Sequence, residues 1–330
     1  MSRLSYTLLL ILSFSCCSGF KEKKFPQEIV IAYGEKVPFQ GVTNPSDLFV
    51  VDGYLVVQNF GREDSLFHVY SLQDFSLKNA FGVIGRGPKE FLFPVIMNVI
   101  HPFVYIMDYD NNNQVSKYRL TSEGNVIFEG HPALSKNRNT FDYRMINDSI
   151  IIFDAFLNSP DIVVYNINCH ETIAKWQYGN PEQQNRYHDE NRGHVYANAS
   201  SVVFCYYLQN RISFRDLHLR SIVDHNYQKE KVVVDTKNFL NNIMHYEYGY
   251  LGNKYFYALY NGFSGEVFRN SGEIGCSLEV YDLKGNPIAR YFFEEKSPRN
   301  FAVDEDSFTL YAYHPDFEDY AMAYHLDGLK

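Results

Sequence analysis

The sequence predicts an all-β fold, and more narrowly a six-bladed β-propeller of four-stranded antiparallel blades whose ring is closed by an N-terminal strand. Three observations predict it. One structural unit recurs six times along the chain, aromatic residues make up 17% of the 330 residues, and helical periodicity is sparse. Strands favour tyrosine and phenylalanine, of which the chain has 27 each. Only residues 237–244 have a pattern that would suit one or two helical turns.

The repeated unit consists of a tight turn, a β-rich run, a polar loop and a second strand that ends in an aromatic residue. In the first copy, Asp52-Gly53 precedes Tyr54–Val57, and the strand after the loop ends at Tyr70. The six closing aromatics are Tyr70, Tyr118, Tyr165, Phe214, Tyr281 and Tyr324. Four of the five intervals between them match the length of a four-stranded propeller blade. The interval after Phe214 is longer and the fourth copy is weak, so five or seven blades are the alternatives.

The two ends of the chain predict how the ring closes. The sixth copy lacks its last strand because the chain stops at Lys330. The extended run Glu28 to Tyr33 would supply that strand, so that both termini contribute to one blade and no sheet edge stays exposed.

The first residues have the features of an export signal. Arg3 precedes an apolar run from Leu4 to Phe14, which is too short to span a bilayer as a helix. Small residues ahead of Cys16 and Cys17 resemble a lipobox, in which one cysteine is lipidated and becomes the new N-terminus. Phe14 interrupts the usual pattern, and ordinary signal cleavage nearby is the alternative.

These features predict the domain organisation and the location. We expect a lipoprotein signal peptide over residues 1–17, a tether over 18–27 and the propeller domain over 28–330. The protein would be an outer-membrane lipoprotein that faces the periplasm or the cell surface and touches the membrane only through its lipid. We expect it to be a monomer.

Charge and cysteine content exclude some classes of protein. A net charge of −9 argues against nucleic acid as a partner. Beyond the signal, Cys169, Cys205 and Cys276 share no CxxC spacing, which argues against a zinc site and permits at most one disulfide.

One segment resembles a known family. Phe81-Gly82-Val83-Ile84-Gly85-Arg86-Gly87-Pro88-Lys89-Glu90-Phe91 resembles the glycine-rich linker of NHL-type propellers, with Lys89 in place of the second glycine. It resembles still more closely the TolB-like six-bladed propeller lipoproteins. The loop from Tyr105 to Val115 resembles the NHL hairpin, with Gln114 in place of its arginine. The resemblance, specific over residues 45–120, implies a six-bladed fold and an envelope setting, and it carries no catalytic motif.

Two local motifs have simpler structural explanations. Gly85-Arg86-Gly87 is not a phosphate loop, because Pro88 and a β-rich run follow where a helix would be needed. We interpret it as a turn between blades from which Arg86 can project. Asp108, Asp110 and Asn112 copy the opening of a calcium loop, but Asn113 and Arg119 stand where that loop needs glycine and glutamate. A hairpin turn is therefore favoured over calcium.

Propeller topology predicts where a ligand would bind. Loops between the second and third strands of a blade emerge on the same face as the connections between blades, so the two longest excursions, 178–195 and 261–277, share one face. Loops on a rigid scaffold often carry function. Residues at the start of the innermost strands would ring a central pocket there: Tyr143, Arg144, His194, Tyr196, His245, Tyr246 and Glu247. Their chemistry suits a polar ligand such as a sugar or peptide; the alternative is that they fill the channel and bind water.

The functional hypothesis is a binding or scaffold module for a glycan, a peptide or an envelope protein, with no catalytic residues. The alternative is a lactonase-like hydrolase or a sugar lyase with a metal on the central axis; a purely structural role in an envelope complex is a third hypothesis. No cofactor is predicted, since no motif supports a calcium ion on the axis. A metal-bound, acidic pore would favour the enzyme, and an aromatic-lined or plugged pore would favour binding.

Overall fold

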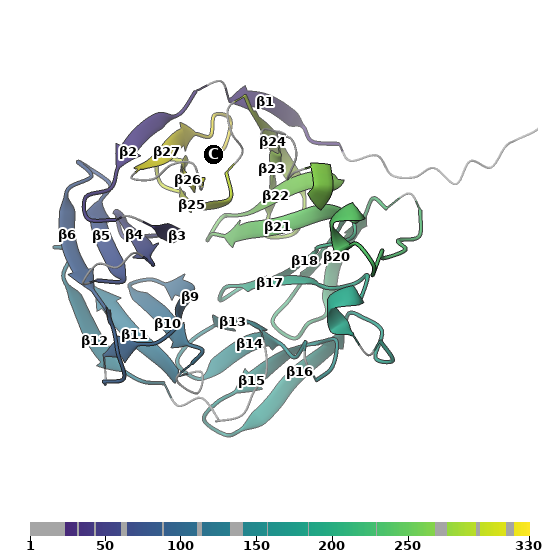
Figure 1. Cartoon of the computed structure of the whole chain (residues 1–330), viewed down its shortest axis with the longest axis horizontal. Helices are drawn as coiled ribbons and strands as arrows, with labels where there is room; N and C mark the ends of the chain where they lie inside the picture. The colour runs from purple at the N-terminus through teal and green to yellow at the C-terminus, as the bar shows by residue number, and fades with distance from the viewer. Residues whose placement is uncertain are drawn as a thin grey trace, which may run out of the picture.

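The computed structural model of the chain describes residues 24–31, 33–42, 44–60, 65–87, 89–110, 114–132, 141–156, 158–183, 185–228, 230–267, 276–294, 298–314 and 320–330. Their strands form six sheets arranged as blades around a ring (Figure 1). The predicted six-bladed β-propeller is confirmed, and the alternatives of five or seven blades are wrong. The signal peptide and both N-terminal cysteines lie outside the described residues.

Each blade is an antiparallel sheet whose strands follow one another in the sequence, from the innermost strand outward. The first blade is formed by β3 (Pro45–Val51), β4 (Tyr54–Asn59), β5 (Phe67–Ser71) and β6 (Leu77–Phe81). The second is formed by β9 (Pro94–Ile100), β10 (Phe103–Asp108), β11 (Gln114–Leu120) and β12 (Val126–Gly130). The third is formed by β13 (Phe141–Met145), β14 (Ile150–Asp154), β15 (Asp161–Asn166) and β16 (Glu171–Gln177).

The remaining three blades repeat this order. The fourth is formed by β17 (Gly193–Ala197), β18 (Val202–Tyr206), β19 (Arg211–Arg215) and β20 (Ser221–Asn226). The fifth is formed by β21 (Ile243–Leu251), β22 (Tyr255–Ser264), β23 (Ser277–Asp282) and β24 (Pro287–Phe293). The sixth takes only three strands from its own stretch of chain, β25 (Asn300–Asp304), β26 (Thr309–Tyr313) and β27 (Tyr320–His325).

A strand from the N-terminal region closes the ring, as predicted, but its residues differ from the expected run. The closing strand is β2 (Glu35–Pro38), which pairs antiparallel with β27. The run Glu28 to Tyr33 mostly forms β1 (Gln27–Ile31), which pairs parallel with β24 as a fifth strand of the fifth blade. Packing explains the difference, because Val37 of β2 is buried between the sixth and first blades whereas β1 buries only Ile31.

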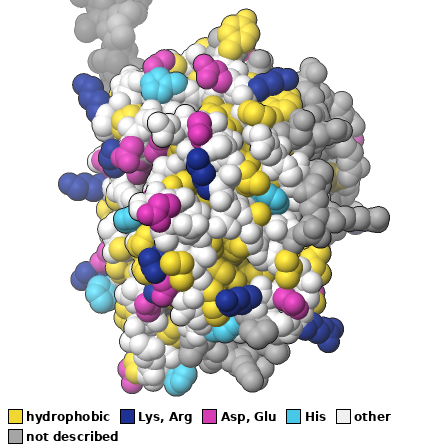
Figure 2. Space-filling view, turned by 90° about the vertical axis from the view of Figure 1, so that its left-hand side faces the viewer, with side chains coloured by type: hydrophobic (Ala, Val, Ile, Leu, Met, Phe, Trp, Pro, Cys, Tyr) yellow, Lys and Arg dark blue, Asp and Glu magenta, His cyan; other side chains and the backbone are white. Residues whose placement is uncertain are grey.

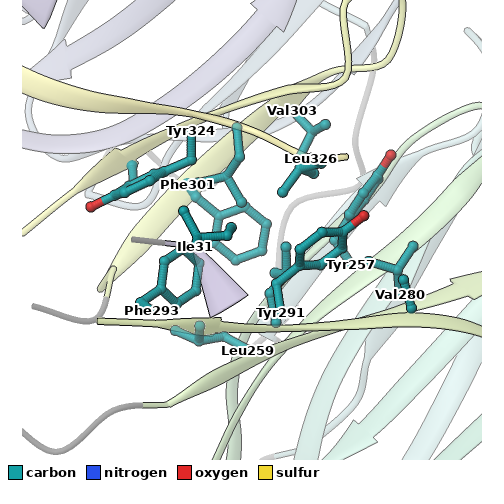
Figure 3. Packing of buried hydrophobic residues seen from close by; sticks show 14 of the residues in the cluster. Ile31, Tyr257, Leu259, Val280, Tyr291, Phe293, Phe301, Val303, Tyr324 and Leu326 are labelled. Atoms are coloured by element: carbon teal, nitrogen blue, oxygen red, sulfur yellow. The ribbon is translucent and has the colours of Figure 1, made fainter. Parts of the chain in front are cut away.

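The core lies between neighbouring blades. All six closing aromatics predicted from the repeat sit on the third strand of their blade and are buried. Figure 3 shows one such interface, where Tyr291 and Phe293 of the fifth blade meet Phe301 and Tyr324 of the sixth. Burying each of these rings contributes on the order of 1.5–3 kcal/mol. The buried Tyr291 hydroxyl still donates a hydrogen bond of 2.7 Å, to the Asp327 carbonyl, as buried polar groups require.

The two ends of the ring differ. We call the loop face the end that carries the connections between blades, among them residues 178–192 and 227–242; the opposite end, with the third-to-fourth strand turns such as 216–220 and 283–286, is the hairpin face. Two 3₁₀ turns, η1 (Arg186–His188) and η2 (Phe239–Asn241), belong to those connections. The predicted helical turn over 237–244 is therefore η2, and β21 takes up its last residues.

The glycine-rich linker is a compact turn folded around one carboxylate. Strand β7 (Val83–Ile84) pairs with β8 (Glu90–Phe91), and the Gly87 amide donates to Glu90 Oε2 at 2.6 Å. A Cβ on Gly85 would lie 2.1 Å from that oxygen, so any other residue there would force the Glu90 side chain to shift. These contacts match the interpretation of the motif as a turn between blades.

Asp108, the first residue of the calcium-like motif, also has a structural task. Its two carboxylate oxygens accept the Leu92 and Phe93 amides at 2.9 and 2.8 Å, which secures the end of the linker. Its oxygens are thus already used by the backbone.

The outer surface carries charges of both signs. Figure 2, which looks onto one side of the ring, shows lysine, arginine and acidic side chains interspersed with apolar ones. Among the described residues, no helix is both long and apolar enough to cross a membrane. Cys169, Cys205 and Cys276 form no disulfide with one another, so the permitted disulfide is not present among these three.

Candidate functional site

A pocket of about 140 Å³ lies on the loop face, between the third and fourth blades. It is lined by Asp142, Asp154, Phe156, Tyr187, Arg192, Gly193 and His194. These residues come from the start of β13, the end of β14 and its following loop, and the connection that leads into β17. The predicted excursion 178–195 thus supplies four of the lining residues. Part of the other excursion, 268–275, lies outside the described residues.

Asp142 has an unusual backbone conformation. Its φ is 50°, in the left-handed region, and the β13–β14 register shifts between Phe141 and Arg144. Such a bulge re-aims a side chain, and the strain of a non-glycine residue there persists only where the surroundings enforce it. Asp142 Oδ2 lies 3.0 Å from His194 Nδ1 on β17, so the bulge directs this carboxylate across the boundary between two blades.

The two carboxyl groups of the pocket have opposite pKa shifts. Burial raises the pKa of Asp142, but the charge and hydrogen bond of His194, helped by Arg144, outweigh it and hold the pKa below its usual value. Burial and the charge of Asp142 raise the pKa of Asp154 well above its usual value, against the opposing hydrogen bond from Tyr178. The surroundings therefore shift the pKa values of the two carboxyl groups in opposite directions, down for Asp142 and up for Asp154.

Asp189 organises the connection that carries Tyr187 and Arg192. This carboxylate is 3% exposed, and its two oxygens accept the amides of Asn180 at 3.1 Å and Asn191 at 2.8 Å. Gln209, from the β18–β19 loop, donates to the Glu190 carbonyl at 3.0 Å. The bond from Gln209 ties the connection to the fourth blade.

Arg192 lies against two parallel aromatic rings. Its guanidinium carbon is 4.5 Å from the centre of the Tyr207 ring and 5.1 Å from that of Phe239, in η2. The two rings are within 4° of parallel. Nη1 of Arg192 donates to the Tyr187 carbonyl at 3.0 Å. The rings and this carbonyl fix the direction in which the guanidinium points.

Of the residues predicted from the sequence, His194 lines the pocket. Three others, Arg144, Tyr196 and Glu247, lie near the residues that contact the lining. Arg144 is on β13 two residues beyond Asp142, with its guanidinium 5.5 Å from the centre of the Tyr196 ring. Glu247 accepts a hydrogen bond of 3.3 Å from Tyr207, which supports Arg192.

The other predicted residues lie away from the pocket. Tyr143 and Tyr246 are buried between blades, where Tyr143 packs on Phe153 and Tyr246 donates to Glu279 at 3.0 Å. His245 is 8% exposed and packs against the Tyr260 ring. Arg86 is exposed on the linker between the first two blades and is not a lining residue.

Five of the lining side chains were not predicted from the sequence: Asp142, Asp154, Phe156, Tyr187 and Arg192. Asp142 directly precedes the predicted pair Tyr143-Arg144, and the bulge that turns it into the pocket has no signature in the sequence. Tyr187 and Arg192 lie within the excursion 178–195, so a search of that loop for aromatic and cationic residues would have found them.

Polar and aromatic side chains of the innermost strands bond from one blade to another. Asn98 of β9 exchanges two hydrogen bonds, of 2.7 and 3.0 Å, with the Met145 backbone of β13. Tyr248 of β21 donates to Asp47 of β3 at 2.9 Å. Within the described part of the chain, no group of three histidine, cysteine or acidic side chains could hold a metal ion.

Comparison with known families decides the relationship of the chain. A family profile described as "TolB-like 6-blade propeller-like" matches residues 19–306. The chain belongs to this TolB-like propeller family. The resemblance first seen in the linker is thereby confirmed over most of the sequence.

Two solved structures share the TolB-like fold. One is a Bacteroides fragilis protein described as exported, with a TM-score of 0.55, 10% identity and coverage of 90% of this chain and 99% of that one. The other is a DUF4221 family member from Bacteroides vulgatus, with a TM-score of 0.52, 13% identity and coverage of 90% and 95%. No curated protein matches this TolB-like chain.

Proposed function

We propose that this TolB-like propeller is a binding module of the cell envelope that takes a polar ligand, part of a glycan, a peptide or an envelope protein, in the pocket between the third and fourth blades. The strained Asp142 carries the proposal. A left-handed aspartate that a bulge aims at His194 inside a pocket costs folding free energy, and such strain clusters at ligand sites. The hydrogen bonds around Asp189 support the proposal, because a binding residue is positioned best when its neighbours are bonded to one another.

The contacts between the innermost strands favour binding over metal-dependent catalysis. The enzyme alternative needs several acidic or histidine side chains converging on the axis. Instead, the Arg144 guanidinium lies over Tyr196, and Tyr248 is hydrogen bonded to Asp47. Because these side chains contact one another, they support a module that holds its ligand at the loop face.

A second candidate is a hydrolase that uses the two pocket carboxyl groups without a metal. The observation that favours it is the opposite pKa shift of Asp142 and Asp154, since a carboxyl group with a lowered pKa suits the role of base and one with a raised pKa suits the role of acid. The two candidates differ in what happens to the ligand. A binding module releases it intact, whereas a hydrolase cleaves it and loses that activity in Asp154→Asn.

The proposal includes export and a lipid on Cys16 or Cys17, based on the apolar run Leu4 to Phe14 and the lipobox-like residues. Strand β1 pairs parallel with β24, which starts at the hairpin face, so Gln27 is at that face as well. A tether upstream of β1 would therefore extend from the hairpin face, on the opposite side of the ring from the pocket. The pocket would then point away from the membrane. Intact mass of the membrane-extracted protein tests the lipid; a mature chain without added acyl mass on either cysteine contradicts it.

Ligand retention tests the binding function. The protein is purified from envelope of the producing cells and examined by native mass spectrometry beside two variants, His194→Ala and His218→Ala. His218 is exposed on the hairpin face of the same blade and serves as the matched control. We expect wild type and His218→Ala to carry a bound small molecule. The fraction of protein that carries it should be at least 10-fold lower in His194→Ala. Equal retention in all three proteins contradicts the site.

A further inference from the structure

We propose that the group bound in this pocket is an organic anion, a carboxylate, and that Arg192 is the residue that binds it. The inference rests on the proposed function and deepens it by naming the chemistry of the ligand. It follows from the partners that Arg192 has and lacks.

Arg192 has no acidic partner in the described part of the chain. Arg119, Arg220 and Arg290 each have a carboxylate within 4 Å, whereas no described carboxylate lies that close to Arg192. Its hydrogen bond among the described residues goes to the Tyr187 carbonyl. A guanidinium has five N–H donors, so most of those of Arg192 remain for a ligand.

The surroundings hold this charge ready for an anion. The rings of Tyr207 and Phe239 contact the guanidinium through cation–π interactions, which leave its in-plane N–H groups free. Arg192 is also half-buried, and burial lowers its pKa while the guanidinium keeps its charge. A half-buried charge without a counter-ion is costly, so an incoming carboxylate gains a strong and directional partner.

The acidic residues of the pocket do not supply that counter-ion. Asp142 is hydrogen bonded to His194 at 3.0 Å. Both oxygens of Asp154 accept the Tyr178 hydroxyl, at 2.9 and 3.0 Å. Each carboxyl group is thus engaged by another part of the protein, and the cation of the lining left to a ligand is Arg192.

The rest of the lining indicates what carries the carboxylate. Phe156 and Tyr187 form an edge-to-face pair, with ring centres 5.1 Å apart, at the wall of the pocket. Such a wall accommodates the apolar face of a ring or a short side chain. An acidic sugar and the C-terminus of a peptide share this combination of a carboxylate and an adjacent apolar face.

Acetate and acetamide test the inference because they match in shape and differ in charge. The backbone amide signals of the full mature chain are followed by ¹⁵N NMR during titration with each probe, in wild type, Arg192→Gln and Arg220→Gln. Arg220 is the control, an arginine on the hairpin face that already has its partner in Asp216. We expect saturable acetate shifts in wild type and Arg220→Gln, at least 5-fold weaker binding of acetamide, and loss of the response in Arg192→Gln. An equal response to both probes, or an acetate response that survives in Arg192→Gln, overturns the inference.

Two further probes identify the source of the carboxylate: D-glucuronate and N-acetyl-alanyl-alanine, each compared with its amide. The probe that binds more tightly than acetate shows whether the ligand is a sugar acid or a peptide C-terminus. If neither binds more tightly than its amide, the inference fails. If the wild-type protein retains a ligand that His194→Ala loses but does not bind acetate, the inference of an anionic ligand is wrong and the proposed binding function is still supported.

Discussion

Tyr248 on β21 donates a hydrogen bond of 2.9 Å to Asp47 on β3, two strands that are not neighbours in the ring because β25 lies between them (Figure 1). Burial raises the pKa of Asp47 to about 6, although this bond, the Leu48 amide and Arg144 oppose the shift. This carboxyl group on β3 is thus ionised at neutral pH at a cost in stability.

Replacing Asp47 with asparagine should stabilise the protein at neutral pH. Because the folded pKa is raised, wild type loses stability as the pH rises from about 4 to about 6. Asparagine avoids this cost and still accepts the Tyr248 hydrogen bond. We therefore expect the free energy of unfolding of Asp47→Asn at pH 8 to exceed that of wild type by about 1–3 kcal/mol. Denaturant unfolding at pH 8 and pH 4 measures it. The difference should vanish near pH 4; a variant less stable at pH 8 contradicts the account.

Removing His194 should reverse the pKa shift of Asp142. With the histidine present, the pKa of Asp142 is lower in the folded protein than in the unfolded chain. The ionised Asp142 therefore stabilises the fold at pH values above its unfolded pKa, and this stabilisation is lost as the pH falls through its folded pKa. In His194→Gln burial is no longer outweighed, and we expect the pKa of Asp142 to rise above its usual range. The ¹³C shift of the Asp142 carboxyl reports this, and an unchanged midpoint would refute the pairing.

The linker turn should show a specific coupling between Gly85 and Glu90. A Cβ on Gly85 would lie 2.1 Å from Glu90 Oε2, so Gly85→Ala should cost about 1–3 kcal/mol of unfolding free energy. Shortening Glu90 to alanine removes the clash, and the double variant should recover at least about 0.5 kcal/mol of the summed single losses. Strictly additive losses in a double-mutant cycle would show that the turn is not built around this carboxylate.

Ring closure predicts a graded response to N-terminal truncation. A chain that starts at Gly34 lacks only β1 and should keep the fold with a modest loss of stability. A chain that starts at Gln40 also lacks β2 and Phe39, which fill the boundary between the sixth and first blades, and each buried side chain lost there costs about 1.5–3 kcal/mol. We expect a clearly larger drop in Tm for the second truncation, measured by circular dichroism. Equal drops would mean that β2 does not close the ring.

The sequence predicted those features of the fold that depend on neighbouring residues, and it did not predict those that depend on contacts between distant segments. The blade count and closing aromatics such as Tyr70 and Tyr281 followed from a repeat that is visible residue by residue. The choice of closing strand was not local, because two extended runs lie next to each other and only the burial of Val37 between two blades selects the second.

The site shows the same division. Tyr143 was predicted in place of Asp142 because successive strand residues face opposite sides, so an unforeseen bulge changes the face that each presents. The excursion holding Arg192 was identified by its length. Its partner rings, Tyr207 and Phe239, come from distant segments that no local pattern connects to it.

Amide hydrogen exchange tests the central claim most directly, because it locates a bound ligand on the protein even when the ligand is unidentified. The mature chain is compared with and without the low-molecular-weight fraction of an envelope extract. We expect new protection confined to peptides covering residues 142–145, 154–156 and 186–194, and none over 216–220 on the hairpin face. Protection confined to the hairpin face or the outer strands, or no protection anywhere, would contradict a binding pocket between the third and fourth blades.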